Sequence, residues 1–190
     1  DCMTLICPCQ VDYIGYNGPE PNTGIPTHQI TTQPSLTEVF MGVIGAHHTC
    51  YTVKEMGRSL AFYKDLLGFE IVHERPAVTS EYFRAIIGFP DAVVHAILLT
   101  IPGTDHHLEL FQYKHPVGVA QDLTPNNPGS SHIAYAIDDL RALYKTLKEA
   151  GVEDFISDPI YLNEGPNKGG WALYLKDPDG IPMELFQLPD

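Results

Sequence analysis

The sequence Glu109-Leu-Phe-Gln112 recurs near the end of the chain as Glu184-Leu-Phe-Gln187. Upstream of each copy, a histidine opens a partly alternating stretch, His48-Thr-Cys-Tyr-Thr-Val53 and His132-Ile-Ala-Tyr-Ala-Ile137. The spacing from histidine to glutamate is 61 residues in the first copy and 52 in the second. The repeat therefore predicts two copies of one structural unit, the first of which carries a nine-residue insertion.

Each repeat has the pattern of a β-α-β-β-β unit. The helices are expected over 57–67 and 139–150, where apolar residues recur at helical spacing. The expected strands cover 48–53, 93–101, 107–112, 132–137, 171–176 and 182–187. The insertion, near 79–90, is expected to form a short helix or a lid. Because neither unit could bury its sheet alone, the repeat predicts an α+β fold in which two paired βαβββ modules form one curved, eight-stranded cup.

The chain divides into three segments. Residues 1–40 contain five prolines and no Lys or Arg, which is typical of an extended arm. The first module is expected over 41–115 and the second over 116–190. The two modules together, 41–190, are expected to form a single domain.

Composition narrows the classes of partner. Asp and Glu outnumber Lys and Arg by 24 to 11, which gives a formal net charge of −13. Such a surface repels nucleic acid and anionic lipid, so neither is expected to be a partner. The apolar run near 95–101 is too short to cross a bilayer. The chain also has nine histidines, which is a reason to look for a metal site.

Four residues at repeat-equivalent positions form the candidate metal site: His48, Glu109, His132 and Glu184. A single histidine on a strand is more often part of a core, but four such residues at matched positions favour a metal site. A pseudo-twofold axis between the modules would bring all four together. Two neutral imidazoles and two carboxylates carry a formal charge of −2, which suits a divalent cation.

Two further residues are candidates for contact with a substrate. His107 lies two residues before Glu109 and therefore faces the same side of its strand. Tyr174 precedes the turn Asp177-Pro-Asp-Gly180 and could form a hydrogen bond with a substrate. Each also has a purely structural interpretation, His107 as a surface or core residue and Tyr174 as a core aromatic.

Together these motifs resemble a known superfamily. Five stretches carry the resemblance: His48–Val53, Ser59–Phe69, Leu108–Leu110, Ser131–Ala134 and Asp177–Leu185. They resemble the vicinal oxygen chelate superfamily, which includes glyoxalase I, methylmalonyl-CoA epimerase, fosfomycin-resistance proteins and extradiol dioxygenases. The resemblance spans roughly residues 43–188, and its members share a metal-binding cup while their chemistry varies.

The resemblance implies a metal and a pocket. The ligand set His48, Glu109, His132 and Glu184 is most similar to the glyoxalase I branch, and implies one divalent metal: nickel, cobalt, zinc or manganese. Glyoxalase I carries an arginine four residues after its first ligand, where this chain has a threonine. The substrate is therefore not expected to be a glutathione hemithioacetal. The residues expected to line the pocket are Thr52, Phe83, Phe89 and Trp171.

Three functions are open at this point. The leading hypothesis is a metal-dependent lyase or isomerase of small oxygenated substrates, with an enolate or enediolate intermediate. Its base is expected to be Glu184, with Glu109 as the second candidate. The first alternative is an iron-dependent extradiol-type dioxygenase that uses His48, His132 and Glu184. The second is a resistance protein that sequesters a small molecule.

Assembly and compartment are also expectations. The superfamily often forms dimers, so a homodimer that acts on a small molecule is expected. The resemblance implies a cytoplasmic protein. The cysteines Cys2, Cys7 and Cys9 and the absence of an initiator Met leave a secreted protein as the alternative. The sequence leaves open the substrate and the disulfide state.

Overall fold

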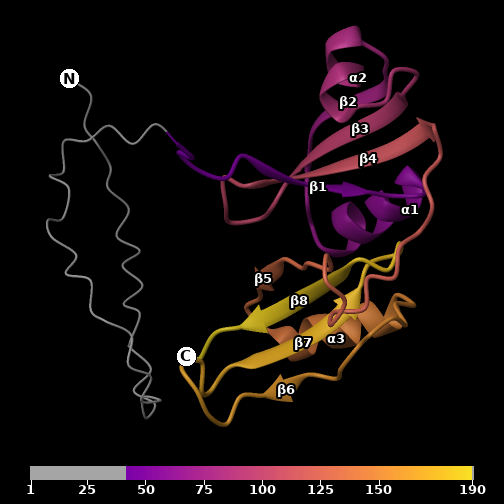
Figure 1. Cartoon of the computed structure of the whole chain (residues 1–190). Coiled ribbons are helices and arrows are strands. Elements are labelled where there is room, and N and C mark those ends of the chain that lie inside the picture. Colours follow the sequence, from indigo (N-terminus) through magenta and orange to yellow (C-terminus); the bar gives the residue numbers. More distant parts are fainter. Residues whose placement is uncertain (1–41, 190) are drawn as a thin grey trace, which may run out of the picture. The chain divides into compact units, whose positions relative to one another are not determined.

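The computed structural model describes residues 42–189, where the two repeats form two βαβββ modules (Figure 1). The first module consists of β1 (His48–Thr52), α1 (Met56–Leu60), the π-helix η1 (Ala61–Leu66), β2 (Ile71–Val78), α2 (Glu81–Ile87), β3 (Val93–Thr100) and β4 (His107–His115). The second consists of β5 (Ala134–Ala136), α3 (Leu140–Glu149), β6 (Ile160–Tyr161), β7 (Trp171–Lys176) and β8 (Pro182–Gln187). The predicted paired βαβββ fold is confirmed. Residues 1–40, the predicted arm, lie outside the described part of the chain.

The eight strands are divided between two sheets instead of forming one. The sheet orders are β1-β4-β3-β2 and β5-β8-β7-β6. In each sheet the opening strand runs parallel to the last strand, and the other neighbours are antiparallel. Strands β1 and β5 are therefore edge strands. Within the described residues, no strand pairs with the outer side of either one. The expected single curved sheet would require these two edges to meet, and in one chain they do not pair.

Most element boundaries agree with the sequence pattern. Strands β7 and β8 have the expected bounds, and α2 forms inside the insertion as the expected short helix. Strand β5 is shorter than expected, with three residues. The predicted helix over 57–67 changes from an α-helix to a π-helix at Ala61. Gly68, at φ +77°, follows this helix in the left-handed conformation that glycine adopts most easily.

Alternation along the strands gives each sheet two faces. In β4, Leu108 and Leu110 are fully buried in the main core, whereas Glu109 between them points to the opposite face. In β8, Met183 and Leu185 are buried in the same way around Glu184. We call the faces that carry the two glutamates the cup faces.

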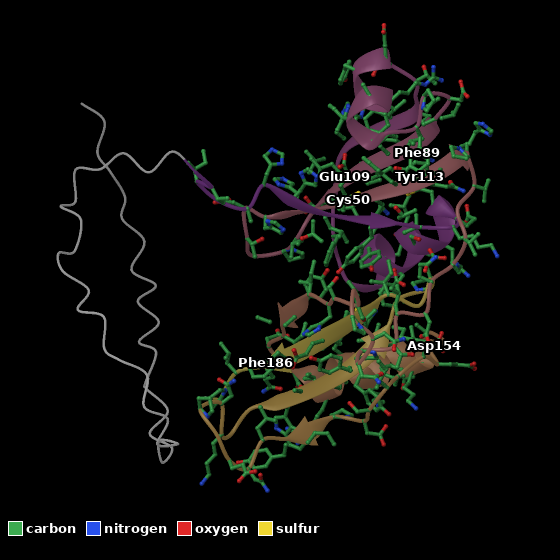
Figure 2. All side chains as sticks on the ribbon, in the orientation of Figure 1. Cys50, Phe89, Glu109, Tyr113, Asp154 and Phe186 are labelled. Atoms are coloured by element: carbon green, nitrogen blue, oxygen red, sulfur yellow. The ribbon has the colours of Figure 1, made fainter. Side chains whose placement is uncertain are left out.

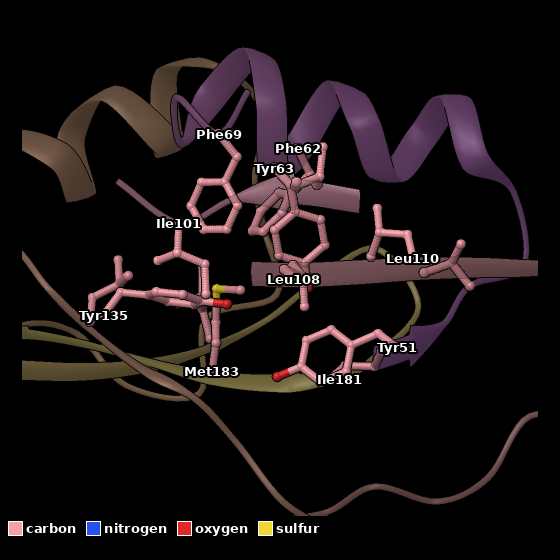
Figure 3. Close-up of a cluster of buried hydrophobic side chains, with 14 of the residues drawn as sticks. Tyr51, Phe62, Tyr63, Phe69, Ile101, Leu108, Leu110, Tyr135, Ile181 and Met183 are labelled. Carbon is pink, nitrogen blue, oxygen red and sulfur yellow. The ribbon is translucent and has the colours of Figure 1, made fainter. Parts of the chain in front are cut away.

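The two modules share one hydrophobic core (Figure 3). It contains Tyr63 from η1 and Leu108 from β4, together with Tyr135 and Met183 from the second module. The rings of Phe69 and Tyr135 meet across the modules with centroids 5.5 Å apart. The core packs against α1, η1 and α3, so burial of apolar surface holds the modules together away from the cup faces.

A turn of the second module also binds the first. The Tyr63 hydroxyl donates a hydrogen bond to Asp177 Oδ2 at 2.9 Å, and both side chains are almost completely buried. Asp179 forms an ion pair with Arg58 and accepts a hydrogen bond from the Lys54 backbone N–H at 3.1 Å. Burial raises the pKa of the Asp177 carboxyl, although hydrogen bonds from the backbone and from Tyr63 partly oppose this.

Each of the two repeated glutamines forms a hydrogen bond with the backbone at or just before the start of the first helix of its module. Gln112 Nε2 donates a hydrogen bond to the Lys54 carbonyl at 2.9 Å. Gln187 Oε1 accepts one from the Leu140 backbone N–H at 3.0 Å. The final letter of the repeat is thus explained by a contact between the last strand and the start of the helix. Among residues 42–189, no helix is long and apolar enough to cross a membrane.

Candidate functional site

The first pair of predicted ligands meets on the cup face of the first module. His48 opens β1, and Glu109 lies on the neighbouring strand β4, where its Cα partner is Cys50. His48 Nε2 lies 3.3 Å from Glu109 Oε2. His47 supports this histidine, because the two Nδ1 atoms are 2.7 Å apart and one must donate to the other. We call His48 and Glu109 the first half-site.

The second pair meets in the same way on the second module. His132 Nε2 lies 3.5 Å from Glu184 Oε2. Tyr174 is the β7 partner of Glu184, and its hydroxyl lies 2.9 Å from His132 Nε2. Burial, followed by the charge of Glu184, raises the pKa of the Tyr174 phenol. We call His132 and Glu184 the second half-site.

The spacing in each half-site is close to that of two neighbouring ligands on one ion. Nitrogen and oxygen ligands of a divalent metal, bound at about 2.1 Å, are roughly 3.0–3.4 Å apart in octahedral or tetrahedral geometry. The separation in the first half-site, 3.3 Å, lies in this range, and the 3.5 Å in the second is slightly longer than its upper end. The donor set, one imidazole and one carboxylate in each pair, therefore fits a divalent metal.

The expected convergence of all four residues is not found within one chain. Among residues 42–189, no three His, Cys, Asp or Glu side chains gather closely enough to hold a metal ion. The reason is the packing of the modules, which meet through the shared core and leave β1 and β5 as separate edges. The assignment of the four residues to one metal stays a prediction.

Other predicted residues also lie on the cup face of the first module. Thr52 is exposed at the end of β1, and His107 pairs with His48 at the start of β4. Cys50, between the two ends of β1, is a free cysteine beside Glu109 (Figure 2). Cys50 is exposed at the edge strand, yet desolvation by the surrounding residues and then the charge of Glu109 raise the pKa of its thiol to about 12. Cysteines 2, 7 and 9 lie outside the described residues.

The insertion builds an aromatic wall on this face. Phe83 of α2 is buried and packs edge-to-face on Phe111, with ring centroids 5.6 Å apart. Phe89 is 45% exposed and contacts Tyr113 with centroids 5.9 Å apart (Figure 2). Of the two pocket-lining residues predicted in the insertion, Phe89 is exposed to solvent. Phe83 is buried and packs beneath the exposed aromatic surface.

Trp171 does not lie where the sequence analysis expected it. It lies on the same face of β7 as Leu173 and Leu175, which are buried in the core, so it faces away from the cup. Its ring contacts Tyr161 and lies 4.8 Å from the Arg141 guanidinium carbon. Trp171 is thus a packing residue on the helix side of the sheet. Its two-residue spacing from Leu173 and Leu175 is the sequence signal that indicates this face.

Two basic residues of β2 were missed from the sequence. Arg75 and His73 share the cup face, because their β3 partners are Ala96 and Leu98. The Arg75 guanidinium Nη2 lies 3.5 Å from Glu109 Oε1. The sequence pattern did not identify this strand, since it contains charged residues and a proline and lacks apolar alternation.

The two half-sites, at matched positions of a duplicated module, are accompanied by a match to a known family. The family model of the glyoxalase/bleomycin resistance protein/dioxygenase superfamily matches residues 45–185. The chain belongs to this superfamily. The match covers both modules, so it confirms the superfamily that the motifs predicted.

Relatives of this superfamily member include enzymes of more than one class. It is 26% identical over 150 residues to a 2-epi-5-epi-valiolone epimerase from Actinomyces sp., covering 78% of this chain and 81% of the relative. It is 28% identical over 142 residues to a probable lactoylglutathione lyase from Vibrio cholerae, covering 74% and 88%. A solved glyoxalase family protein from Bacillus cereus superposes with a TM-score of 0.69 at 15% identity, over 80% of this chain and 99% of that one. The structural likeness supports the fold.

Proposed function

We propose that this protein is a divalent-metal-dependent lyase or isomerase that acts on a small oxygenated substrate. The observation that carries the proposal is the pair of half-sites, each with an imidazole nitrogen and a carboxylate oxygen 3.3–3.5 Å apart. The names of the relatives, an epimerase and a probable lyase, support the same two enzyme classes. Nickel, cobalt, zinc and manganese are the metals that we expect His48, Glu109, His132 and Glu184 to hold.

A bound divalent ion would supply Lewis acidity toward a substrate oxygen and so stabilise negative charge that develops there. The protein supplies the proton transfer. A carboxylate of the cup takes the proton from a carbon next to a carbonyl, and the electron pair of that C–H bond moves toward the carbonyl oxygen. Return of the proton to the other face or to the neighbouring carbon completes an epimerisation or isomerisation, whereas loss of a leaving group completes a lyase reaction.

We assign the base to Glu184. Ion pairs within the described residues engage both oxygens of Glu109, one with His48 and the other with Arg75. Among the described residues, Glu184 contacts His132 and the Tyr174 hydroxyl, and no arginine holds it. Glu184 is therefore the carboxylate with more freedom to move toward a substrate, and Tyr174 beside it would orient the substrate or the carboxylate.

The proposed metal site combines the first half-site of one copy with the second half-site of another copy. The half-sites do not combine within one chain, and each lies at the exposed edge strand of its sheet. Exposed edges are usually covered, and a symmetric pair of chains would cover both types of edge at once. Such a homodimer would contain two equivalent sites.

A mixing experiment tests this arrangement. One variant carries His48→Ala and Glu109→Ala, and the other carries His132→Ala and Glu184→Ala. Each variant alone should bind no nickel at the site. After unfolding and refolding as a one-to-one mixture, random pairing should restore about a quarter of the wild-type sites, because half of the dimers contain one intact site. Absence of nickel from the mixture would contradict the shared site.

The reaction class has its own test. Nickel-loaded protein should exchange the CH₂ hydrogens of hydroxyacetone with solvent deuterium, measured by NMR. Glu184→Gln should slow this exchange by about 100-fold or more, since general bases contribute about 10²–10⁴-fold. Glu153→Gln, an exposed residue outside the cup, is the matched control. Unchanged exchange in Glu184→Gln, at equal metal content, would refute the assignment of the base.

One observation favours the alternative, an iron-dependent dioxygenase. If Arg75 retained Glu109, the remaining residues His48, His132 and Glu184 would form the two-histidine, one-carboxylate set of non-haem iron enzymes. Oxygen uptake by the iron-loaded protein with catechol would support this alternative. A sequestering protein, the third hypothesis, would bind its ligand without either reaction.

A further inference from the structure

We infer that Arg75 binds an anionic group of the substrate, so that the substrate class is small oxygenated molecules that carry a carboxylate or a similar anion. The inference rests on the proposed function, because it uses the same cup. It adds a residue that the sequence motifs do not include, and a chemical class of substrate.

The position of Arg75 is set by the sheet. Its β3 partner is Ala96, and Ala96 pairs in turn with Phe111 on β4. Residues paired across strands share a face, so Arg75 lies on the cup face one step along the strands from Glu109. Its guanidinium reaches across β3 to the first half-site, at 3.5 Å from Glu109 Oε1.

This contact leaves most of the guanidinium free. The side chain of Arg75 is 38% exposed, and 3.5 Å is at the outer limit of a hydrogen bond. An arginine has five N–H donors in a planar fork that matches a carboxylate, and the contact with Glu109 uses one nitrogen. The remaining N–H groups can donate hydrogen bonds to a second anion.

The charges of the completed cup also favour an anion. Two glutamates and one divalent ion would balance each other, so Arg75 would remain as a positive charge without compensation. His73, two residues away on the same face, adds a ring nitrogen that can donate a hydrogen bond to an anion. The apolar ring of Phe111 lies in the same row of the sheet, across Ala96 from Arg75, and apolar surroundings strengthen an interaction between opposite charges.

In the described part of the second module, no arginine or lysine forms an ion pair with Glu184. Strand β6 has only two residues, Ile160 and Tyr161. The residue that faces Glu184 across the ladder is the uncharged Tyr174. Lys176 shares this face of β7 with Tyr174, but its partner on β8 is Pro182, one step along the strands from Glu184. Arg75 instead contacts the glutamate of its own half-site, so we expect an anionic substrate to place its anion toward β2 and its reacting carbon toward Glu184.

Three hydroxamates separate this inference from the proposed function. The experiment measures their affinity for the nickel-loaded full chain by calorimetry. Acetohydroxamate, a neutral chelator, reports on the metal site alone. Succinic acid monohydroxamate adds a carboxylate, and its carboxamide analogue has nearly the same shape without the charge. The ratio of the last two affinities isolates the carboxylate contact.

Wild-type protein should bind the carboxylate probe about five- to tenfold more tightly than the amide, as expected for a charge-assisted contact with a partly exposed arginine. Arg75→Gln should reduce this ratio to about one, and acetohydroxamate measured with the same variant corrects for any change at the metal site. Arg75→Lys, which retains the charge without the fork, should retain part of the preference. Arg141→Gln, which removes the same charge from α3 on the other side of the sheet, should leave the ratio unchanged.

Two results would overturn the inference while leaving the metal site intact. One is a wild-type ratio near one together with tight binding of acetohydroxamate. The other is a full preference in Arg75→Gln. Failure of acetohydroxamate to bind the nickel-loaded wild-type protein would instead overturn the proposed metal site, and the inference with it.

Discussion

Replacement of Tyr63 by phenylalanine should weaken the junction between the two modules. The Tyr63 side chain is completely buried, and its hydroxyl donates to Asp177 Oδ2 at 2.9 Å. Phenylalanine retains the ring that packs against Phe62 and Phe69. The substitution therefore removes one hydrogen bond and leaves an oxygen of a buried carboxyl group without this donor.

The magnitude follows from that loss. A hydrogen bond to a charged group contributes about 1.5–3 kcal/mol, so the free energy of unfolding should fall by about that amount at pH 7. For a chain of this size the melting temperature should fall by roughly 3–12 °C. The other Asp177 oxygen still accepts hydrogen bonds from the Asp179 and Ile181 backbone N–H groups, both at 2.8 Å. The turn itself should therefore persist.

The loss should depend on pH. Burial raises the pKa of Asp177 above its ordinary value of 3.8, so the folded protein binds this proton more tightly than the unfolded chain. The contribution of Asp177 to stability is therefore most favourable at low pH and declines as pH rises through the folded-state pKa. The Tyr63 hydroxyl opposes the rise in pKa, and without it the pKa of Asp177 should rise further. The difference between variant and wild type should then increase from pH 4 to pH 7.

Urea unfolding at equal protein concentration, at pH 4, 5.5 and 7, measures these differences. Tyr82→Phe is the matched control, because that side chain is 65% exposed and the change should alter stability by less than about 0.5 kcal/mol. In an Asp177→Asn background, Tyr63→Phe should cost less than in the wild type. Equal stability of Tyr63→Phe and wild type at pH 7, or a loss that is independent of pH, would refute the reasoning.

Three further predictions concern other parts of the fold. Phe83→Ala removes a buried ring from the contact with Phe111 and should cost about 3 kcal/mol; hydrogen exchange should locate the loss in α2, and unchanged protection there would contradict the aromatic wall. Gly170→Ala should destabilise the protein by about 1–3 kcal/mol, because an added Cβ would collide with the Gln187 carbonyl oxygen; an unchanged melting temperature would exclude that collision. Cys50, with its thiol pKa raised to about 12 by burial, should react with iodoacetamide at pH 8 about 100-fold or more slowly than in urea, by peptide mass spectrometry; equal rates would show that its thiol is not desolvated.

The fold was largely predictable because its signals are local. Apolar alternation located β7 and β8, and helical spacing located the helices on the core side of each sheet. The same alternation makes Glu109 and Glu184 face away from the buried apolar residues on either side of them. Trp171, which was expected in the pocket, lies on the core side because it shares its face of β7 with Leu173 and Leu175.

The missed part of the site depends on contacts between residues far apart in the chain. Arg75 reaches Glu109 only because β3 lies between β2 and β4 and the arginine side chain extends across it. Nothing in the sequence near Arg75 resembles an alternating strand, so no local pattern could indicate which face it would occupy. Its role became visible once the order of the strands was known.

By itself, the sequence determined the duplicated βαβββ module and the face of each sheet on which a histidine and a glutamate lie. For His48, Glu109 and Glu184 these features follow from periodicity within a strand, which needs no knowledge of the rest of the chain, whereas His132 lies two residues before β5. The tertiary structure decided that each histidine lies beside its own glutamate and that the two pairs stay apart in one chain. The physical reason is that the shared core between the modules forms on the sides opposite the cup faces, so burial of apolar surface sets the distance between the half-sites.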